Sequence, residues 1–564
     1  MKFGPLVSSV CAFLLAGCAA QQASTSLAPA APIEVQILAI NDFHGNIEAP
    51  PGPVSIAQPD GTILKARVGG AAQLAGALAQ ARSGHPNSIT VAAGDLIGAS
   101  PFSSAHFLDE PTVDAMNMAG LSLASVGNHE FDKGSAELLR MQRGGCEKHT
   151  TRVPCALEPF AGARFHYLAA NVVGSDGATI FPATAIRQVG PIRIGFIGET
   201  LKETGTLVSP AGVAGLRFTD EAATANALVP QLKAAGADAI VLLIHQGGTL
   251  PETYVEQGCN GLSGDILPIL DQLDPAITTV ISGHTHQAYA CALQKGGATR
   301  LLTSAGKYGY LYTDLRLSFD PATRRLIGEH AANVPVTGQS GADPAVAALV
   351  ERYVAAAKPA AERVVGHLPA PLSKSGTERE SPVADLIADA QLAATKGPTH
   401  GAADLSFINS GGVRTDLVPN TDGSITYAQI FALEPFGNNL VVKTLTGAQL
   451  QALLEQQFVE RGGAAAFQAS ILIPSANFTF AYDLSKPAGQ RVVAMTLNGK
   501  PIDPAARYRV TVNNFLASGG DGYSVLTQGS DSFDAGLDLD ALEAWLATNP
   551  AAPVVGRMKD VTPR

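Results

Sequence analysis

The sequence predicts an α/β fold, with an N-terminal layered α/β domain joined by a helix to a second, C-terminal domain. Short β-branched apolar runs alternate with longer alanine- and leucine-rich segments from residue 33 to about residue 336. This alternation is typical of strands layered against helices. It stops at "GQSGADPA", where a helical pattern and a new set of strand candidates begin. A separate domain is therefore expected there.

The N-terminal domain is expected to span residues 33–336. Its β-branched runs predict buried strands, and its longer alanine-rich runs predict helices. The strands are expected at residues 33–40, 88–94, 193–198, 237–244 and 277–282. The clearest helices are expected at residues 69–82 and 221–236.

The linker and the C-terminal domain follow. Residues 337–361 are expected to contain one amphipathic helix at residues 344–358, because apolar side chains recur there at helical spacing. These side chains are Val346, Leu349, Val350 and Tyr353. The second domain is expected at residues 362–555, with strands at residues 404–414, 440–445, 478–484 and 507–517.

The composition describes a globular protein that is too long for one ordinary core. The chain has 564 residues, of which 46% are hydrophobic and 15% charged, whereas domains average about 150 residues. Its formal net charge of −11 argues against a nucleic-acid duplex as a partner, because such binding needs a basic face. An anionic small molecule remains possible as a ligand, since bound cations can dominate the local field.

The first residues have the features of a leader. Lys2 precedes a short apolar stretch, and "LAGC" at residues 15–18 resembles the lipobox of bacterial lipoproteins. That resemblance implies a lipoprotein signal peptide at residues 1–18, cleavage before Cys18 and acylation of its thiol. An ordinary secretion signal with an incidental cysteine is the alternative. Residues 19–32 are expected to be a flexible tether. Because Ala19 replaces the Asp that would retain a lipoprotein at the inner membrane, a periplasmic or cell-surface protein of the outer membrane is expected.

Four of the six cysteines lie outside the leader. An even number of cysteines in an oxidising compartment predicts disulfides. Three connectivities are possible, and the most local one joins Cys146 to Cys155 and Cys259 to Cys291.

Side chains of the kinds that bind metals follow five expected strands: those at residues 33–40, 88–94, 237–244 and 277–282, and the short apolar run "LSLASV" at residues 121–126. In open α/β sheets, sites form beyond the carboxyl ends of the strands, so these side chains are expected to converge. Each residue alone has a structural alternative, such as a capping turn or a solvated histidine, but their recurrence at five strand ends favours a metal site. They are Asp42, His44, Asp95, Asn128, His129, His245, His284 and His286.

This set of ligands indicates a particular chemistry. Imidazole, carboxylate and amide groups together suit borderline first-row divalent ions such as zinc, manganese or cobalt. Two such ions about 3.5–4 Å apart can share one carboxylate, hold a hydroxide and bind the oxygens of a phosphate. Asp95, on a tight "GD" turn, is the expected bridging ligand.

The motifs "NDFHG", "GD", "GNHEFD", "HQGG" and "GHTH" occur in that order and resemble those of the calcineurin-like metallophosphoesterases. More narrowly they resemble the secreted 5′-nucleotidase family, which includes bacterial UDP-sugar hydrolases. "NSGGVR", "EPFGN" and "NNFLASGGDGY" resemble the C-terminal nucleotide-binding domain of that family. The resemblance implies an N-terminal metallophosphoesterase domain followed by an α+β nucleotide-binding domain.

The resemblance also implies a role for each metal-type residue. Asp42, His44, Asp95 and His286 would surround one ion, and Asp95, Asn128, His245 and His284 the other. His129 would pair with Asp132 and face the scissile phosphate, where a protonated imidazole stabilises developing charge. Glu130 receives no role.

In the second domain the resemblance implies a nucleotide site. Phe436 and Phe515 would stack on the base, a contact worth about 1–3 kcal/mol per base. Asn438 would meet the base edge and Asp521 the ribose. Arg379 and Arg414 would hold the anionic part of the nucleotide.

Two positions depart from the family pattern. Ser375, beside Lys374, stands where an arginine is usual, and Asp385 stands where asparagine is usual. Because of these departures, the resemblance defines the preferred substrate less closely than it defines the phosphatase reaction.

The resemblance implies an extracytoplasmic, monomeric 5′-nucleotidase that uses a metal-held hydroxide to release nucleoside and phosphate. UDP-sugars and nucleoside di- or triphosphates would be further substrates. Two alternatives are a 2′,3′-cyclic-nucleotide phosphodiesterase with 3′-nucleotidase activity and a nucleotide-binding surface lipoprotein without turnover.

Overall fold

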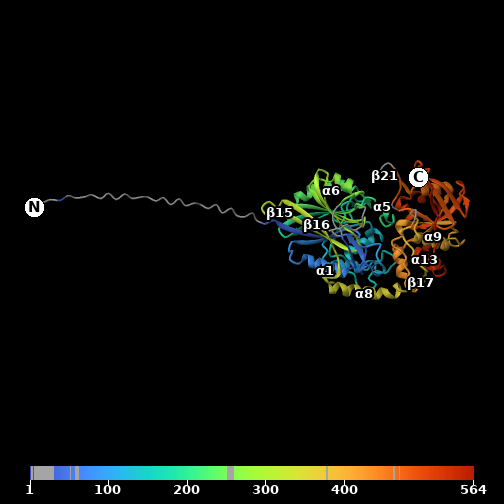
Figure 1. Ribbon diagram of the computed structural model, residues 1–564, viewed down its shortest axis with the longest axis horizontal. Coiled ribbons are helices and arrows are strands. Elements are labelled where there is room, and N and C mark those ends of the chain that lie inside the picture. The colour runs from blue at the N-terminus through green and yellow to red at the C-terminus, as the bar shows by residue number, and fades with distance from the viewer. Residues whose placement is uncertain are drawn as a thin grey trace.

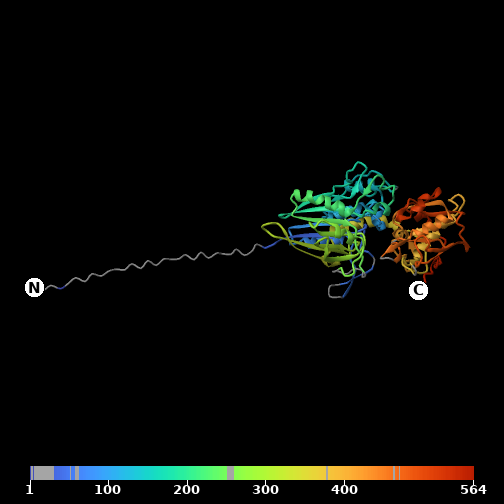
Figure 2. The same ribbon diagram turned by 90° about the horizontal axis from the view of Figure 1, so that it is seen from above.

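The chain forms two lobes that follow one another in sequence (Figure 1; Figure 2). This computed structural model describes Met1, Gly4 and residues 31–563, apart from residues 51, 58–61, 151, 251–258, 377–378, 462–463 and 469. The expected two-domain α/β fold is confirmed. The exact domain limits stay predictions, and most of the leader, including Cys18, and most of the tether lie outside the described residues.

Two six-stranded sheets form the centre of the N-terminal lobe. The first contains, in spatial order, β16 (Leu326–Pro335), β15 (Leu311–Phe319), β1 (Ile33–Ile40), β4 (Ser88–Ala93), β5 (Leu123–Ser125) and β6 (His166–Leu168). The second contains β13 (Ala288–Lys295), β14 (Ala298–Ala305), β12 (Ile277–Ser282), β11 (Ala239–His245), β9 (Ile192–Thr200) and β8 (Thr184–Val189).

The two sheets are packed face to face. One apolar core joins side chains of β1, β4 and β15 to side chains of β9, β11 and β12, including Ile37, Val91, Phe196 and Leu243. Strands buried on both faces lose the alternation of polar and apolar residues. This burial explains why β4 and β11 read as nearly continuous apolar runs in the sequence.

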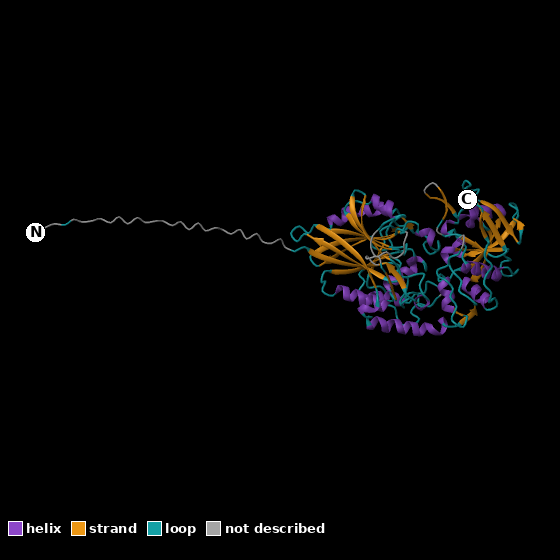
Figure 3. Ribbon diagram, viewed as in Figure 1, coloured by secondary structure: helices purple, strands orange, loops and turns teal. Residues whose placement is uncertain are grey.

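Helices cover the outer faces of the two sheets (Figure 3). On the first sheet lie α1 (Ala71–Arg82), α3 (Glu110–Ala119) and α4 (Ser135–Arg143). On the second lie α6 (Glu221–Ala234) and α7 (Ile266–Gln272), whose apolar faces meet Ile197, Leu242 and Val280. The short helices α2 (Phe102–Ala105) and α5 (Thr204–Leu207) lie on the side of the C-terminal lobe.

The carboxyl ends of the central strands lie at one edge in each sheet. β1, β4 and β5 run parallel, with Ile40 opposite Ala92 and Ala93 opposite Ser125. β11 and β12 also run parallel, with Ile244 opposite Ser282. The loops that follow these five strands therefore emerge together, as expected, although from two sheets.

Helix α8 (Pro344–Ala361) links the lobes along the lower edge of Figure 1. Asp343 caps it by accepting hydrogen bonds from the N–H groups of Ala345 and Val346 at 2.9 and 3.0 Å. Its buried face packs against α1, α2 and α3. The helix continues three residues beyond the expected end at residue 358.

The described part of the C-terminal lobe includes two larger sheets and five α-helices. The first sheet has the order β23 (Leu472–Pro474), β18 (Leu405–Asn409), β27 (Arg507–Asn513), β20 (Asn439–Thr446) and β28 (Ser530–Leu537). The second has the order β26 (Lys500–Pro501), β25 (Val492–Leu497), β24 (Phe478–Tyr482) and β29 (Met558–Asp560). The helices are α9 (Pro382–Thr395), α10 (Tyr427–Leu433), α11 (Gly447–Glu455), α12 (Asn514–Ala517) and α13 (Asp538–Leu546).

Two expected strands are shorter than the sequence predicts. β27 ends at Asn513, because the side chain of Asn513 accepts a hydrogen bond from the N–H of Leu516 at 2.8 Å and so starts α12. β18 ends at Asn409, and a 3₁₀ turn follows at Ser410–Gly412. Both breaks place polar side chains at the carboxyl end of a strand.

The cysteines pair in the most local way, as Cys146–Cys155 and Cys259–Cys291. Among the helices described, none combines the length and the apolar character that spanning a bilayer requires.

Candidate active site

The metal-type residues of the five strand ends converge in one buried cluster. Nε2 of His44 lies 3.8 Å from Oδ1 of Asp42 and 3.6 Å from Oδ2 of Asp95. Nε2 of His286 lies 3.4 Å from Oδ1 of Asp42, and Nε2 of His245 lies 2.9 Å from Oδ2 of Asp95. Asp95 thus lies between two groups of possible ligands.

The second group also includes an amide. Nδ1 of His284 lies 3.1 Å from Oδ1 of Asn128. The ligand atoms of Asp95, His245 and His284 all lie within 4.8 Å of one another, as do those of Asp42, His44 and His286. The structure therefore brings together all seven residues expected to bind metal.

Unusual backbone conformations aim these side chains. Asp42, His44, Asp95, His284 and His286 all have positive φ, between 47° and 72°. Residues other than glycine rarely adopt this region, and each such residue costs about 1–3 kcal/mol. The surrounding fold must hold these turns in place, which is typical of functional sites.

Backbone carbonyls fix the tautomers of two histidines. Nδ1 of His245 and Nδ1 of His44 lie 2.8 Å and 2.9 Å from carbonyl oxygens, so Nδ1 carries a proton in both rings, and Nε2 of the neutral His44 presents a lone pair. Nε2 of His44 then faces Nε2 of His286 at 3.1 Å. A ring nitrogen so close to this lone pair either donates a hydrogen to it or shares a cation with it.

Burial disfavours a proton on Nε2 of His44. Burial lowers the pKa of His44 to about 3 and raises the pKa of Asp42 to about 7, because neither charged form is solvated there. A divalent metal ion satisfies lone pairs and carboxylates at once. The residues present therefore fit metal ions.

His129 and Asp132 form a pair at the rim of this cluster. Nδ1 of His129 lies 2.8 Å from Oδ2 of Asp132, and the backbone N–H of His129 donates to Oδ1 of Asp95 at 2.9 Å. Burial opposes protonation of His129, but the carboxylates of Asp132 and Asp95 outweigh it and raise the pKa of the imidazole. A protonated, oriented imidazole can stabilise negative charge that develops beside it.

Glu130 is a residue that sequence reasoning missed. Its buried carboxylate accepts hydrogen bonds from the N–H groups of Asp95 and Leu96, both at 2.8 Å, and of Gly127 at 2.6 Å. It therefore ties the loop after β4 to the loop after β5. The only signal in the sequence is its place within "GNHEFD".

Asn41 has a similar supporting role. Its amide donates to Oδ2 of Asp42 at 2.6 Å and to the carbonyl of Gly306 at 2.8 Å. Its position next to Asp42 in "NDFHG" is the only feature of the sequence that points to this role.

A cavity of about 300 Å³ joins this cluster to the C-terminal lobe. On one side it is lined by Asn128, His129, Asp132 and His284, and on the other by Asn409, Arg414, Phe436, Asn438, Phe515 and Asp521. The rings of His129 and Phe436 are stacked, with centroids 5.9 Å apart. Residues expected to bind phosphate and base thus share one cavity.

Glycine lets the backbone approach one of the aromatic rings. A Cβ on Gly520 would lie 2.4 Å from the ring of Phe515, so no larger residue fits there without movement. Asp521 follows with a positive φ of 53°, and its Oδ2 accepts hydrogen bonds from Ser470 and from Asn409, the latter at 2.7 Å. These supporting residues, Asn409 and Ser470, were not singled out in the sequence.

The two arginines lie in different places. Arg414 lines the cavity, with its guanidinium 5.8 Å from the ring centroid of Phe436. Arg379 is exposed, lies 5.3 Å from the ring centroid of Phe467 and is not among the described residues that line the cavity. Lys374, beside the departure at Ser375, has its Nζ 3.5 Å from the carbonyl oxygen of Arg414.

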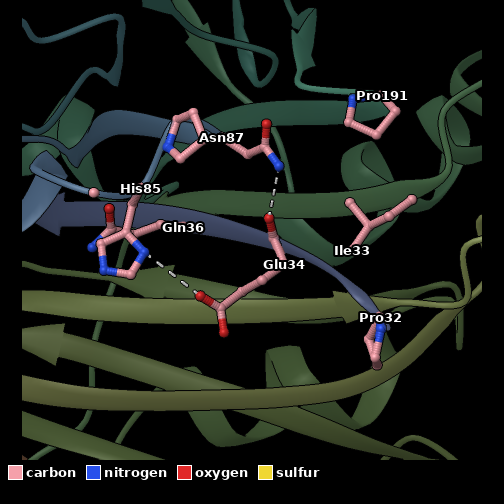
Figure 4. A pocket seen from close by; sticks show the side chains of 9 residues that line it. Pro32, Ile33, Glu34, Gln36, His85, Asn87 and Pro191 are labelled. Atoms are coloured by element: carbon pink, nitrogen blue, oxygen red, sulfur yellow. Dashed lines mark hydrogen bonds and ion pairs between the residues drawn. The ribbon is translucent and has the colours of Figure 1, made fainter. Parts of the chain in front are cut away.

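A second hollow of about 350 Å³ lies at the start of β1 (Figure 4). Its lining includes Glu34, His85 and Asn87, and the amide of Asn87 donates to the carbonyl of Glu34 at 3.2 Å. Although it is slightly larger, its described lining contains none of the residues expected to bind metal or nucleotide. The residues expected to bind metal and nucleotide therefore gather at the cavity between the lobes.

The comparisons with known proteins match each of the two lobes to a family. The family described as calcineurin-like phosphoesterase matches residues 35–288, and the family described as 5′-nucleotidase, C-terminal domain, matches residues 364–528. The crystal structure of a 5′-nucleotidase precursor from Thermus thermophilus is 25% identical, with a TM-score of 0.74, and the match covers 94% of this chain and all of that one.

Two bacterial relatives are longer than this chain. The protein named Endonuclease YhcR of Bacillus subtilis is 29% identical over 87% of this chain, which spans 38% of that protein. The cell wall protein Lmo0130 of Listeria monocytogenes is 29% identical over 89% of this chain, which spans 65% of that protein. Because both domains are matched, one after the other, this chain belongs to the calcineurin-like phosphoesterases that carry a 5′-nucleotidase C-terminal domain.

Proposed function

We propose that this protein is a metal-dependent 5′-nucleotidase, which hydrolyses nucleoside 5′-monophosphates to nucleoside and phosphate. The observation that carries this proposal is the single cavity lined by Asn128, His129 and His284 on one side and by Phe436 and Phe515 on the other. A nucleotide has a phosphate at one end and an aromatic base at the other. The cavity offers matching groups at both ends.

The proposed roles follow from the contacts of each residue. Asp42, His44, Asp95 and His286 would hold one divalent ion, and Asp95, Asn128, His245 and His284 a second. Such ions, zinc, manganese or cobalt by ligand type, polarise phosphoryl oxygens and lower the pKa of water when bound. Asp95 would bridge the two positions, since it faces His44 and His245.

The remaining polar residues would position the substrate and handle charge. His129, kept protonated by Asp132, would stabilise charge on the phosphoryl group and supply a proton to the departing ribose oxygen. Arg414 would hold the phosphate through the N–H donors of its planar guanidinium. Arg379 would join it only after its loop moves, because it lies outside the cavity here.

The C-terminal lobe would select for nucleosides. Phe436 and Phe515 would stack on the base, Asn438 would meet its edge, and Asp521, held by Asn409, would accept hydrogen bonds from the ribose. This selection would tolerate different bases, because every base has a π-face.

UDP-sugars and nucleoside di- or triphosphates are proposed as further substrates, and Lys374, whose Nζ lies 3.5 Å from the carbonyl oxygen of Arg414, would bind their additional phosphate. We also propose that the protein is an extracytoplasmic monomer and that acylated Cys18 holds it at a membrane. Metabolic labelling with a fatty acid, lost in Cys18→Ser, tests that anchor; an unlabelled wild-type chain would contradict it.

The function is tested by measuring phosphate release from 5′-AMP, 3′-AMP, 2′,3′-cyclic AMP and UDP-glucose, before and after treatment with a chelator. The proposal expects the highest kcat/KM with 5′-AMP, loss of activity with the chelator and recovery with manganese or zinc. Preference for the cyclic or 3′ substrate would favour the phosphodiesterase alternative. Tight binding of 5′-AMP without release of phosphate would favour a binding protein.

A further inference from the structure

The hydrogen bonds of Asp521 occupy only one of its two carboxylate oxygens. Asp521 lines the cavity from the turn at Gly520–Gly522. Its Oδ2 accepts a hydrogen bond from the hydroxyl of Ser470 and another from the side-chain amide of Asn409, the latter at 2.7 Å. Among the residues that the structure describes, none donates to Oδ1. A ligand in the cavity therefore meets one oxygen that is already in use and one that is open.

The direction of the hydrogen bond from Ser470 is fixed by a second partner. Oγ of Ser470 accepts the backbone N–H of Gly411 at 3.0 Å, and an N–H can only donate. The hydroxyl hydrogen is therefore left to point to Asp521. The hydroxyl of the buried Tyr523 donates to the carbonyl of Ser470 at 2.9 Å and holds the backbone of this residue in place. The link from Ser470 to Asp521 is made by side chains, so Ser470→Ala removes it.

The amide of Asn409 is oriented in the same way. Its Oδ1 accepts a hydrogen bond from the side-chain amide of Asn513 at 3.1 Å, so its own NH₂ group faces Asp521. Burial raises the pKa of Asp521, and the donors on Ser470 and Asn409 act against this rise. Both donors thus favour the ionised acid, whose open Oδ1 can only accept a hydrogen bond.

The ligand group that suits this oxygen is a hydroxyl. A ribose presents two adjacent hydroxyls, at O2′ and O3′, and either can donate to a carboxylate oxygen. A sugar without them would cover Oδ1 and leave it without a donor, which weakens binding. The open oxygen therefore distinguishes sugars by their hydroxyl groups, whereas stacking on Phe436 and Phe515 distinguishes only whether a base is present.

We propose that Ser470 is a positioning residue for recognition of the ribose: its hydroxyl holds Asp521 so that Oδ1 accepts a hydrogen bond from O2′ or O3′. The site thereby selects ribonucleotides over nucleotides that lack these hydroxyls. This role rests on the proposed nucleotidase function, to which it adds a residue and a class of preferred substrate.

The test compares hydrolysis of 5′-AMP with hydrolysis of 2′,3′-dideoxyadenosine 5′-monophosphate, which lacks both hydroxyls. In wild type, kcat/KM should be about 10–100-fold higher for 5′-AMP, the usual size of hydrogen bonds to a charged acceptor. In Ser470→Ala this ratio should fall by about 3–10-fold, because Asp521 loses one of its two donors. The fall should come from 5′-AMP alone, with kcat/KM for the dideoxynucleotide within about twofold of wild type.

Ser518→Ala is the matched control. Ser518 is an exposed serine close in sequence to Asp521, and its hydroxyl donates to the carbonyl of Asn514 at 2.9 Å. This variant should match wild type with both nucleotides. Should Ser470→Ala not fold, Asn409→Ala removes the other donor, and the same fall in the ratio is expected.

Three outcomes would overturn the role of Ser470. They are equal kcat/KM values for the two nucleotides in wild type, an unchanged ratio in Ser470→Ala, and an equal fall with both nucleotides in that variant. In each of these cases wild type still hydrolyses 5′-AMP, so the proposed function stands. Wild-type protein that hydrolyses p-nitrophenyl phosphate but neither nucleotide would instead defeat the proposed function, and the role of Ser470 with it.

Discussion

At the scale of single residues, the site combines common side chains with backbone conformations that the sequence does not reveal. The types and order of Asp42, His44, Asp95, His245 and the other cluster residues are visible as motifs. Their positive φ angles are not, because a left-handed residue other than glycine is stabilised by its surroundings and not by its own propensity. Gly127 shows how closely these surroundings fit, since a Cβ there would lie 2.2 Å from Oδ1 of Asp95.

His129 should matter for turnover and not for metal binding. Its Nδ1 is directed to Asp132, and its imidazole is kept protonated by the two nearby carboxylates. His129→Ala is expected to lower kcat by about 10²–10⁴-fold, the usual worth of a positioned acid or charge stabiliser. The metal content, measured by mass spectrometry of the dialysed protein, should equal that of wild type. The exposed His400 provides the control, since His400→Ala should change neither quantity. Full activity in His129→Ala, or loss of metal along with activity, would contradict the role.

Asp385 should make stability depend on pH. Arg557 binds Asp389 through both terminal nitrogens of its guanidinium, at 3.0 and 2.7 Å, and its backbone N–H donates to Glu380 at 3.0 Å. Asp385 is left with a longer contact, in which its Oδ1 lies 3.3 Å from Nε of Arg557. Burial raises the pKa of Asp385 to about 8. The folded protein thus binds this proton more tightly than the unfolded chain, and stability falls as the pH rises from about 4 to about 8.

Asp385→Asn removes this titration. At pH 5 its melting temperature should be close to that of wild type, and at pH 8.5 it should be higher by about 2–5 °C. Thermal unfolding followed by circular dichroism at both pH values measures the difference. Asp389→Asn, which breaks the bidentate pair with Arg557, should melt lower than wild type at both. An Asp385→Asn difference that does not grow with pH would show that Asp385 is charged in the folded protein.

At the scale of elements, the loops after β4 and β5 are held together by one buried acid. Glu130 accepts N–H groups from both loops, and these loops carry Asp95, Asn128 and His129. The sequence places Glu130 in a motif but gives no reason for it, because its partners lie up to 35 residues away in the chain. A side chain that only accepts backbone hydrogen bonds produces no recognisable pattern in the sequence.

Glu130→Ala would leave several buried N–H groups without an acceptor, each costing about 1–3 kcal/mol. The variant is therefore expected to melt well below wild type and to lose metal more readily to a chelator, since both loops that carry ligands are released. The rate of metal loss and the melting temperature are the measurements. Glu137→Ala should lower the melting temperature by breaking the buried pair with Arg140, but it should not change the rate of metal loss. Equal rates of metal loss in Glu130→Ala and wild type would show that the loops are held by other contacts.

Two features of the strands also show where sequence patterns fail. The run at residues 507–517 reads as one strand, yet it turns into α12 because Asn513 caps the helix. The apolar runs predicted the five strands before the metal cluster, but not their division into two sheets. Local composition reports burial, whereas strand pairing depends on contacts far apart in the chain.

At the scale of the whole molecule, the site is completed by two lobes that meet along one cavity. The N-terminal lobe supplies the metal-type cluster and the C-terminal lobe the aromatic pair. Motifs in the sequence predicted the metal-type cluster and the aromatic pair, but not the contact between the two lobes. No sequence motif specifies how one domain packs on another. The stacked rings of His129 and Phe436, with centroids 5.9 Å apart, form one contact between the two lobes at this cavity.

This division of labour predicts that substrate preference and chemistry can be changed separately. Phe515→Ala removes one stacking surface in the C-terminal lobe and leaves every metal-type residue of the N-terminal lobe in place. It should raise the KM for 5′-AMP by about 5–100-fold, which corresponds to about 1–3 kcal/mol of stacking. The KM for p-nitrophenyl phosphate should change by less than about twofold, because that substrate occupies only the phosphoryl end. Phe533→Ala, at an exposed ring on β28, should leave both constants unchanged. If Phe515→Ala raised both KM values equally, the cavity would act as one undivided site, and the separate roles of the two lobes would be wrong.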